Sequence, residues 1–386
     1  MKFLFTCQGY RGLQSADFVP DGVCALVGAN GSGKSTLLSA LEFLGSLFSR
    51  TTQSAIALDG GHWGLLNLDA QSQAVEMVLN LDCQEWYVRL TPHAPGNYSL
   101  HEHIRSETGE DLLNPMVSDI SRRTYRGTEL RRGDGTFLRL AWDLLGDPEI
   151  SDLVNFIQNI RTYRHYRLSQ LREHGSRADS GLRLQREGEN LFAVLRNWRD
   201  QRDLKSSYDF VIESLRAAFP DFFEDFEFYG DAQTVSGKVY LQGIREAMPV
   251  SFIPDGLLVA MVHLAAVAGA PARSFVAIDD FENYLHPFAI RSLIESIRGL
   301  AAQRDLCVLM ATHSPVVLDE FRMEPFRVFV MDFEPPNKPI PLNDLRDPEW
   351  LSHFSLGDLY SKLEFGARLP RTATTETADT TMRNGS

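Results

Sequence analysis

The chain has 386 residues, of which 44% are hydrophobic and 23% are charged, so it can bury a sizeable core as one large domain or two ordinary ones. Its 51 acidic residues outnumber its 38 basic residues. The resulting formal net charge of −13 argues against a protein that coats DNA by bulk charge, because phosphate binding needs an excess of cations. A local basic patch stays compatible with this charge. Of the 38 basic residues, 32 are arginine and six are lysine.

Cysteine usage and hydropathy predict a cytoplasmic, soluble protein. The four cysteines are scattered without a CxxC pair, as is usual in a reducing compartment. The N-terminal segment MKFLFTCQGYRG lacks the apolar core of a secretion signal. The longest apolar stretch, residues 257–272, is too short to span a bilayer and contains His263, so we expect a buried helix there and no membrane association.

The N-terminal third predicts strands around one helix. Residues 2–7 and 23–28 are short apolar runs flanked by turn residues, and residues 36–48 carry leucines at helical spacing. Residues 74–82 and 85–90 are two further strand candidates.

From residue 137 to 230 the pattern is helical and rich in arginine, with candidate helices in FLRLAWDLL, LVNFIQNIRTY, NLFAVLRNW and YDFVIESLRAAF. Residues 238–244 predict a strand and 257–269 a helix. Residues 275–278 and 307–312 are apolar without alternation, which is typical of buried parallel strands, and 287–303 between them is an amphipathic helix. Residues 327–332 predict one more strand, and the Thr-rich tail 369–386 is predicted to be disordered.

The segment GANGSGKS matches the phosphate-binding pattern GxxxxGK[ST] between an apolar strand and a helix. Glycines let successive backbone N–H groups point inward at a phosphate, and the following helix directs its positive end at the anion. Lys34 is expected to reach the β- and γ-phosphates and Ser35 to bind Mg²⁺. The predicted ATP-binding residues of this loop are Gly28, Ala29, Asn30, Gly31, Ser32, Gly33, Lys34, Ser35 and Thr36.

Two other apolar strands end in polar residues of the kind that catalyse phosphoryl transfer. FVAI is followed by Asp279 and Asp280, a Walker B arrangement in which Asp279 binds Mg²⁺ and Asp280 polarises the attacking water. CVLMAT delivers His313 to the end of its strand. Since ligands of open α/β sheets bind beyond the carboxyl ends of the strands, His313 is expected to face the γ-phosphate together with Lys34 and Asp279.

Together, GANGSGKSTLL, ENYLHP after Asp280, and THSP resemble the ATP-binding-cassette (ABC) class of P-loop ATPases. Within it they are similar to the SMC, RecF and OLD-like branch, and especially to the short stand-alone bacterial AAA family ATPases. The resemblance covers residues 1–95 and about 235–335, and WLSHFSLGDLYSKLEFG (350–366) resembles the C-terminal end of these proteins. It implies an α/β fold, a P-loop ABC-type ATPase head with a mixed sheet flanked by helices and a mainly helical insertion.

The resemblance also implies an ABC signature, for which the candidate is Phe252-Ile253-Pro254-Asp255-Gly256. Asp255 and Gly256 fit the pattern and would contact ATP held by a second protomer. Pro254 stands where the family has a serine that contacts the γ-phosphate, and proline has neither a hydroxyl nor an N–H. Asp280 stands where the family usually has glutamate, and a carboxylate set back by about 1.5 Å can cost about 10²-fold in rate. Both departures predict slow or partner-gated hydrolysis.

Two positions stay open. The family's Q-loop glutamine corresponds to Gln71, Gln73 or Gln84. Arg11, in the segment GYRGL, either stacks on the adenine or is a solvated turn arginine.

Residues 161–186 contain seven arginines, and RTYRHYRLSQLR interleaves them with aromatic residues. This pattern suits a solvated helix face, a DNA contact or a protein-partner surface. Residues 101–234 are too short and too irregular for the long coiled coil of true SMC proteins.

We therefore predict an N-terminal ATPase lobe (1–100), a mainly helical insertion (101–234) and a C-terminal ATPase lobe (235–368). The resemblance implies a homodimer of heads around ATP and Mg²⁺ that controls a separately encoded nuclease or toxin in anti-phage defence or DNA maintenance. The alternatives are a non-hydrolysing, ATP-dependent scaffold and the nucleotide-binding subunit of a transporter.

Overall fold

The computed structural model describes residues 1–67, 74–94, 97–113, 122–131, 133–332, 338–362 and 365. The candidate glutamines Gln71 and Gln73 and the tail 369–386 lie outside these residues. None of the described helices combines the length and the apolar character needed to cross a bilayer.

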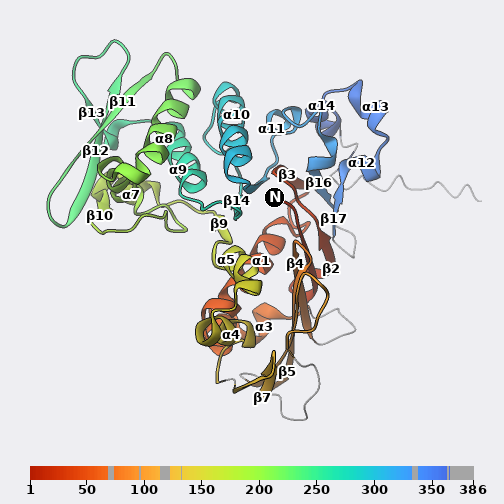
Figure 1. Ribbon diagram of the computed structural model, residues 1–386. Coiled ribbons are helices and arrows are strands. Elements are labelled where there is room, and N and C mark those ends of the chain that lie inside the picture. Colours follow the sequence, from red (N-terminus) through yellow and green to blue (C-terminus); the bar gives the residue numbers. More distant parts are fainter. Residues whose placement is uncertain are drawn as a thin grey trace, which may run out of the picture.

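A six-stranded sheet forms the centre of the molecule, in the order β17-β16-β3-β15-β14-β9 (Figure 1). Its strands are parallel except β17. Alternate residues of β3 point to opposite faces, so Cys24 and Leu26 join one hydrophobic core while Ala25 and Val27 join another. Both faces of the sheet are therefore covered, which explains the uninterrupted apolar runs in the sequence. The strands are β3 (Val23–Gly28), β9 (Arg161–Tyr163), β14 (Phe275–Ile278), β15 (Cys307–Ala311), β16 (Val328–Met331) and β17 (Pro339–Pro341).

A layer on one side of the central sheet packs an antiparallel sheet, in the order β2-β1-β4-β5-β6, against helices (Figure 1). A two-stranded ribbon, β7-β8, extends it. Its strands are β1 (Phe3–Tyr10), β2 (Leu13–Phe18), β4 (Val75–Leu81), β5 (Gln84–Ala94), β6 (Asn97–Arg105), β7 (Arg122–Tyr125) and β8 (Thr128–Arg131). Its helices are α1 (Lys34–Ser49), α2 (Thr52–Leu58), α3 (Gly61–Leu65), α4 (Phe137–Leu145) and α5 (Ser151–Gln158).

On the other side of the central sheet, a helical layer packs with a small antiparallel sheet in the order β10-β12-β11, with β13 beside β12. The helices are α6 (Leu168–His174), α7 (Leu191–Asp200), α8 (Lys205–Ala218), α9 (Asp255–Ala268) and α10 (Pro287–Arg304). The strands are β10 (Ser176–Arg177), β11 (Phe223–Gly230), β12 (Thr234–Leu241) and β13 (Met248–Pro249). The chain closes with α11 (Pro315–Asp319), α12 (Leu342–Leu345), α13 (Pro348–Ser352) and α14 (Leu356–Ser361).

The predicted helix in LVNFIQNIRTY is wrong in its second half. Helix α5 ends at Gln158, and Arg161–Tyr163 is strand β9, which pairs in parallel with β14. The central sheet thus takes one strand from the segment 101–234, and α4 and α5 of the same segment pack with α1 in the core that contains the β2-β1-β4-β5-β6 sheet. The seven arginines are not on one inserted helix either, since Arg161 lies on β9 and only Arg172 lies on α6.

Candidate functional site

The loop after β3 has the geometry of a phosphate cradle. Gly28 (φ 156°), Gly31 (φ 81°) and Gly33 (φ 104°) all have positive φ. At Gly28 a Cβ atom would lie 2.3 Å from the Met331 carbonyl oxygen, and at Gly33 it would lie 3.2 Å from Leu13 and from Met331. Gly28 therefore leaves no room for a side chain and Gly33 leaves little, and α1 begins directly after the loop at Lys34.

Lys34 is buried inside this loop. Its Nζ donates to the carbonyl oxygens of Gly28 at 2.8 Å and Ala29 at 3.2 Å. Burial lowers the pKa of Lys34, while Asp279, Asp280 and Glu282 raise it. The ammonium group of Lys34 is therefore within electrostatic range of the acidic residues that follow β14.

Ser35 and Asp279 meet across 244 residues of sequence. The Ser35 hydroxyl donates to Asp279 Oδ2 at 3.0 Å. Asp279 directly follows β14, and its backbone N–H donates to the carbonyl oxygen of Tyr163 at the end of β9. The pairing of β14 with β15, and of β15 with β3, brings these ends to one edge of the sheet. A hydroxyl and a carboxylate oxygen at this distance are suited to a shared Mg²⁺ ion.

The residues after Asp279 form a tight turn. Asp280 is exposed and has a left-handed backbone (φ 52°), which aspartate tolerates better than most residues. Glu282 accepts hydrogen bonds from the Thr312 hydroxyl at 2.6 Å and from the His313 N–H at 2.7 Å. Both of its oxygens are therefore engaged in holding the loop that carries His313.

His313 lies next to the C-terminal segment of the chain. Its Nδ1 is 3.2 Å from the hydroxyl of Tyr360 on α14. Burial lowers the pKa of His313 and Lys34 lowers it further, so the imidazole is neutral at pH 7. Tyr360 was not a predicted site residue, because nothing in the sequence around it indicates that α14 packs on α11.

The signature-like residues lie apart from this group. Asp255 pairs with Arg172 at 2.6 Å, and the same arginine donates to the Ile253 carbonyl oxygen. A Cβ on Gly256 would lie 2.5 Å from the Tyr284 carbonyl oxygen, so the start of α9 packs closely on the turn after Asp280. Within the described residues, no hydrogen bond or ion pair joins Asp255 or Gly256 to the P-loop.

The structure describes two of the residues whose roles the sequence left open, Gln84 and Arg11. Gln84 is buried, donates to the Glu149 carbonyl oxygen at 2.6 Å and accepts from the Leu153 N–H at 3.3 Å, so it connects β5 to α5 and does not face the P-loop. His165, which follows β9 at the same sheet edge as Asp279, is exposed and has φ 57°; no pattern in the sequence singled it out. Arg11 is not a solvated turn arginine, because it pairs with Asp59 at 2.8 Å and donates to the Gly64 carbonyl oxygen.

A family model described as "AAA domain, putative AbiEii toxin, Type IV TA system" matches residues 23–319, which is more than half of the chain. The chain belongs to this family. In this AAA-domain protein, the matched region contains the P-loop, Asp279, Asp280 and His313. A comparison with curated proteins finds no match.

One solved structure supports the fold of this AAA-domain protein, and two others are weaker matches. The crystal structure of an SMC head bound to the C-winged helix domain of ScpA is 12% identical, with a TM-score of 0.53, over 89% of this chain and 99% of that one. The SMC head domain from Thermotoga maritima (14% identity, TM-score 0.44, 88% and 99% coverage) also matches. So does an SMC head with an extended coiled coil from Pyrococcus furiosus, bound to the C-terminal domain of ScpA (10%, 0.48, 94% and 99%). The predicted fold, an SMC-like ABC-type P-loop ATPase head, is confirmed.

Proposed function

We propose that the protein binds and slowly hydrolyses ATP, and that it uses ATP to switch a partner. The observation that carries the proposal is the 3.0 Å hydrogen bond between Ser35 and Asp279, because it unites the phosphate loop with the acidic end of β14. In this proposal the loop residues 28–36 hold the phosphates and Lys34 neutralises their charge. Mg²⁺, held by Ser35 and Asp279, would offset charge on the phosphate oxygens during hydrolysis.

Asp280 is the group proposed to orient the attacking water. It is exposed at the same turn as Asp279, whereas both oxygens of Glu282 already accept hydrogen bonds. The neutral imidazole of His313 is proposed to contact the γ-phosphate. The shorter carboxylate of Asp280 supports slow turnover, since small misplacements of a catalytic group cost large factors in rate.

A homodimer around two ATP molecules is the proposed active form. Phe252 (73% exposed), Tyr284 (68%) and Phe288 (53%) lie around the start of α9 and the turn after Asp280. Exposed aromatic side chains gathered in one place are typical of protein interfaces. This supports contact of Asp255 and Gly256 with ATP held by a second copy, and the helix N-terminus behind Pro254 would offer backbone N–H groups there.

The proposed partner is a separately encoded nuclease or toxin, in anti-phage defence or DNA maintenance. The family description names a putative toxin and a toxin–antitoxin system, and an SMC head of the same fold is bound to ScpA. Co-expression with each neighbouring gene product, followed by co-purification with and without ATP, would identify the partner.

ATP binding is tested by isothermal titration with ATP and Mg²⁺, alongside phosphate release. Lys34→Ala should lower ATP affinity at least about 100-fold, because it removes the buried cation of the loop. Lys205→Ala is the matched control, since Lys205 is an exposed lysine on α8 that pairs with Asp209. Equal affinity of the two variants would contradict the assignment. Sedimentation velocity with ATP then tests the dimer, which Phe252→Ser should weaken.

A further inference from the structure

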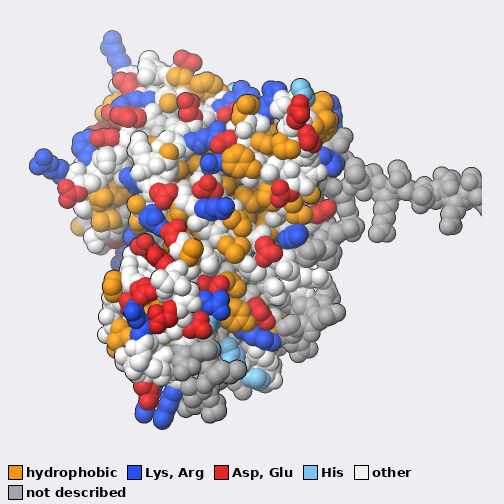
Figure 2. Space-filling model, turned by 45° about the vertical axis from the view of Figure 1, so that its right-hand side comes forward, with side chains coloured by type: hydrophobic (Ala, Val, Ile, Leu, Met, Phe, Trp, Pro, Cys, Tyr) orange, Lys and Arg blue, Asp and Glu red, His pale blue; other side chains and the backbone are white. Residues whose placement is uncertain are grey.

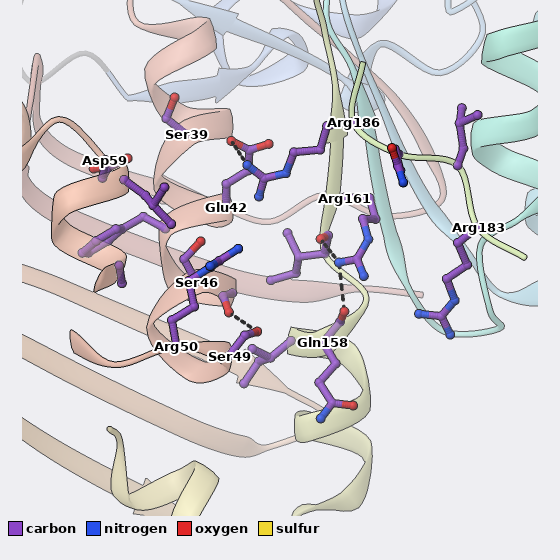
Figure 3. A pocket seen from close by; sticks show the side chains of 18 of the residues that line it. Ser39, Glu42, Ser46, Ser49, Arg50, Asp59, Gln158, Arg161, Arg183 and Arg186 are labelled. Carbon is purple, nitrogen blue, oxygen red and sulfur yellow. Dashed lines mark hydrogen bonds and ion pairs between the residues drawn. The ribbon is translucent and has the colours of Figure 1, made fainter. Parts of the chain in front are cut away.

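A cleft of about 690 Å³ lies beside α1, outside the group formed by Ser35, Asp279 and His313 (Figure 3). One wall is made by α1 and α2, and the other by the end of α5, the start of β9 and residues 183–186. The wall along α1 begins at Ser39, one turn beyond Ser35, and ends at Arg50.

The lining of this cleft is strongly cationic. It contains two carboxylates, Glu42 and Asp59, and five arginines, which are Arg11, Arg50, Arg161, Arg183 and Arg186. Asp59 pairs with Arg11 at 2.8 Å. Glu42 pairs with Arg164 at 3.2 Å and with Arg186 at 3.7 Å. Both carboxylates of the cleft are thus already paired, with Arg11 or with Arg164 and Arg186.

Three of the arginines have no carboxylate partner among the described residues. Arg161 donates to the carbonyl oxygens of Gln158 and Ile160, and Arg183 donates to the amide oxygen of Asn159 at 2.6 Å. Arg50 is exposed at the end of α1. Burial lowers the pKa of Arg161, and the nearby charges of Arg183 and Arg186 lower it further. An anion in the cleft would relieve this uncompensated positive charge.

The surroundings indicate what kind of anion fits. Cationic and anionic side chains are interspersed on the face shown in Figure 2, and no broad basic surface is seen there. The α1 wall runs from Ser39 to Arg50, about 16 Å at 1.5 Å per residue, which is the axial length of roughly five nucleotides of a stacked strand at about 3.4 Å of axis per nucleotide. Ser46 and Ser49 add hydroxyl donors along it. Guanidinium groups bind phosphate oxygens in pairs.

The described lining offers no exposed aromatic ring on which a base could stack. Its one aromatic ring, Phe43, is 2% exposed and stacks on Tyr10 in the core. We propose that the cleft binds the phosphodiester backbone of a single nucleic-acid strand, without reading its sequence. A cleft of this volume admits a few nucleotides of one strand, whereas a duplex could only lie across its rim.

Strand β9 connects the cleft to the ATPase residues. It starts at Arg161 in the cleft, and it ends at Tyr163, whose carbonyl oxygen accepts from the Asp279 N–H at 3.0 Å. Its next residue, Arg164, bonds to Ser39 and Glu42 of α1. A bound strand would therefore contact residues that are bonded to both α1 and β14, the elements that carry the proposed ATP site. An effect of the strand on ATP hydrolysis rests on the proposed function, but binding of the strand does not.

Binding is tested without ATP, by fluorescence anisotropy of a labelled 12-nucleotide oligothymidylate between 50 and 200 mM KCl. The cleft variant is Arg50→Glu/Arg183→Glu, and the charge-matched control is Arg202→Glu/Arg245→Glu, two exposed arginines outside the cleft. The cleft variant should bind at least about tenfold more weakly at 100 mM KCl and reduce the salt slope by about 1.4, since each lost phosphate contact removes about 0.7. Arg50→Lys/Arg183→Lys should keep most of the slope.

Thermal melts show whether each variant is folded. If the melting temperature of Arg50→Glu/Arg183→Glu falls below that of the wild type, Arg50→Ala/Arg183→Ala is used in its place. Lys34→Ala should bind the strand as the wild type does, so failure of the ATP assignment is distinguishable from failure of this one. The proposal is overturned if the wild type does not bind the probe at 50 mM KCl, or if cleft and control variants have the same slope. It is also overturned if inorganic tripolyphosphate displaces the probe as well as unlabelled strand does at equal phosphate concentration.

Discussion

The backbone N–H of His313 donates a 2.7 Å hydrogen bond to Oε1 of Glu282, and Oε2 of the same carboxylate accepts a 2.6 Å bond from Thr312. One side chain thus joins the turn after β14 to the loop after β15. Because this carboxylate is engaged on both oxygens, we infer that Glu282 positions His313 and that Asp280 acts on water.

Glu282→Gln should separate these two roles. The amide oxygen can still accept from the His313 N–H, and the Thr312 hydroxyl must turn to accept from the amide NH2, so both hydrogen bonds lose their charge assistance, at a cost of about 1–2 kcal/mol. We expect the free energy of unfolding in urea to fall by that amount and phosphate release to slow roughly tenfold, with ATP affinity retained. Glu295→Gln, at an exposed position of α10, is the control. Equal urea midpoints for the two variants would refute the positioning role.

Tyr360→Phe tests the contact between α14 and His313. The hydroxyl lies 3.2 Å from Nδ1 and can either donate to it or accept from it, so the contact holds the orientation of the imidazole ring. We expect phosphate release to fall several-fold with little change in ATP affinity. Tyr240→Phe, which removes an exposed hydroxyl bonded to Glu227, should have no effect. Because burial lowers the pKa of His313, any decline of the wild-type rate on acidification should be centred below about pH 6.5, the usual histidine value, and a decline centred at or above that value would contradict a neutral imidazole.

Gly256→Ala should strain the junction between α9 and the turn after Asp280. The added Cβ would lie 2.5 Å from the Tyr284 carbonyl oxygen, so backbone must shift. Overpacking of this kind costs about 1–3 kcal/mol. Gly299→Ala on α10 is the matched control, because its Cβ meets nothing within 4 Å and should stabilise the helix by about 0.5–1 kcal/mol. Melting temperatures that shift in the same direction would contradict the prediction.

His263 should make stability depend on pH. It is fully buried against Phe281 and Tyr166, neither ring nitrogen has a partner, and burial lowers its pKa to about 3. Since the unfolded value is about 6.5, the unfolded chain alone takes up this proton below pH 6.5, and stability falls by about 1.4 kcal/mol per pH unit between 6.5 and 3.

His263→Leu should remove this dependence. The difference in the free energy of unfolding between variant and wild type should grow by roughly 2–3 kcal/mol from pH 6.5 to 4.5. The opposite trend of Asp59, whose pKa burial raises to about 6, is common to both proteins and cancels. A difference that is constant with pH in urea titrations would show that His263 is protonated in the folded state.

The sheet around the P-loop was predictable because its signals are local. The runs before Gly28 and Asp279 are apolar and end in residues that cannot continue a strand, and β3 and β14 end where predicted. Helix α10 was likewise predicted to within one residue at its C-terminal end, because its apolar residues recur at helical spacing and Pro287 opens it.

What the sequence did not predict depends on contacts between distant segments. Strand β9 continues the apolar spacing of α5, and only its pairing with β14 makes it a strand. Tyr360 reaches His313 across 47 residues, and the cleft beside α1 is completed by residues 183–186. No local sequence pattern indicates such proximity. The sequence therefore showed how many arginines residues 161–186 contain, but not that some of them line a cleft beside α1.

Single-turnover hydrolysis tests the central claim most directly. The wild type and Asp280→Asn are each mixed in excess over γ-labelled ATP with Mg²⁺, and bound ATP and free phosphate are followed over time. The account predicts that both proteins retain the label initially, that the wild type releases it slowly as phosphate, and that Asp280→Asn keeps it as ATP. Equal rates of release from the two proteins, or no release from either, would contradict an ATPase in which Asp280 acts on water.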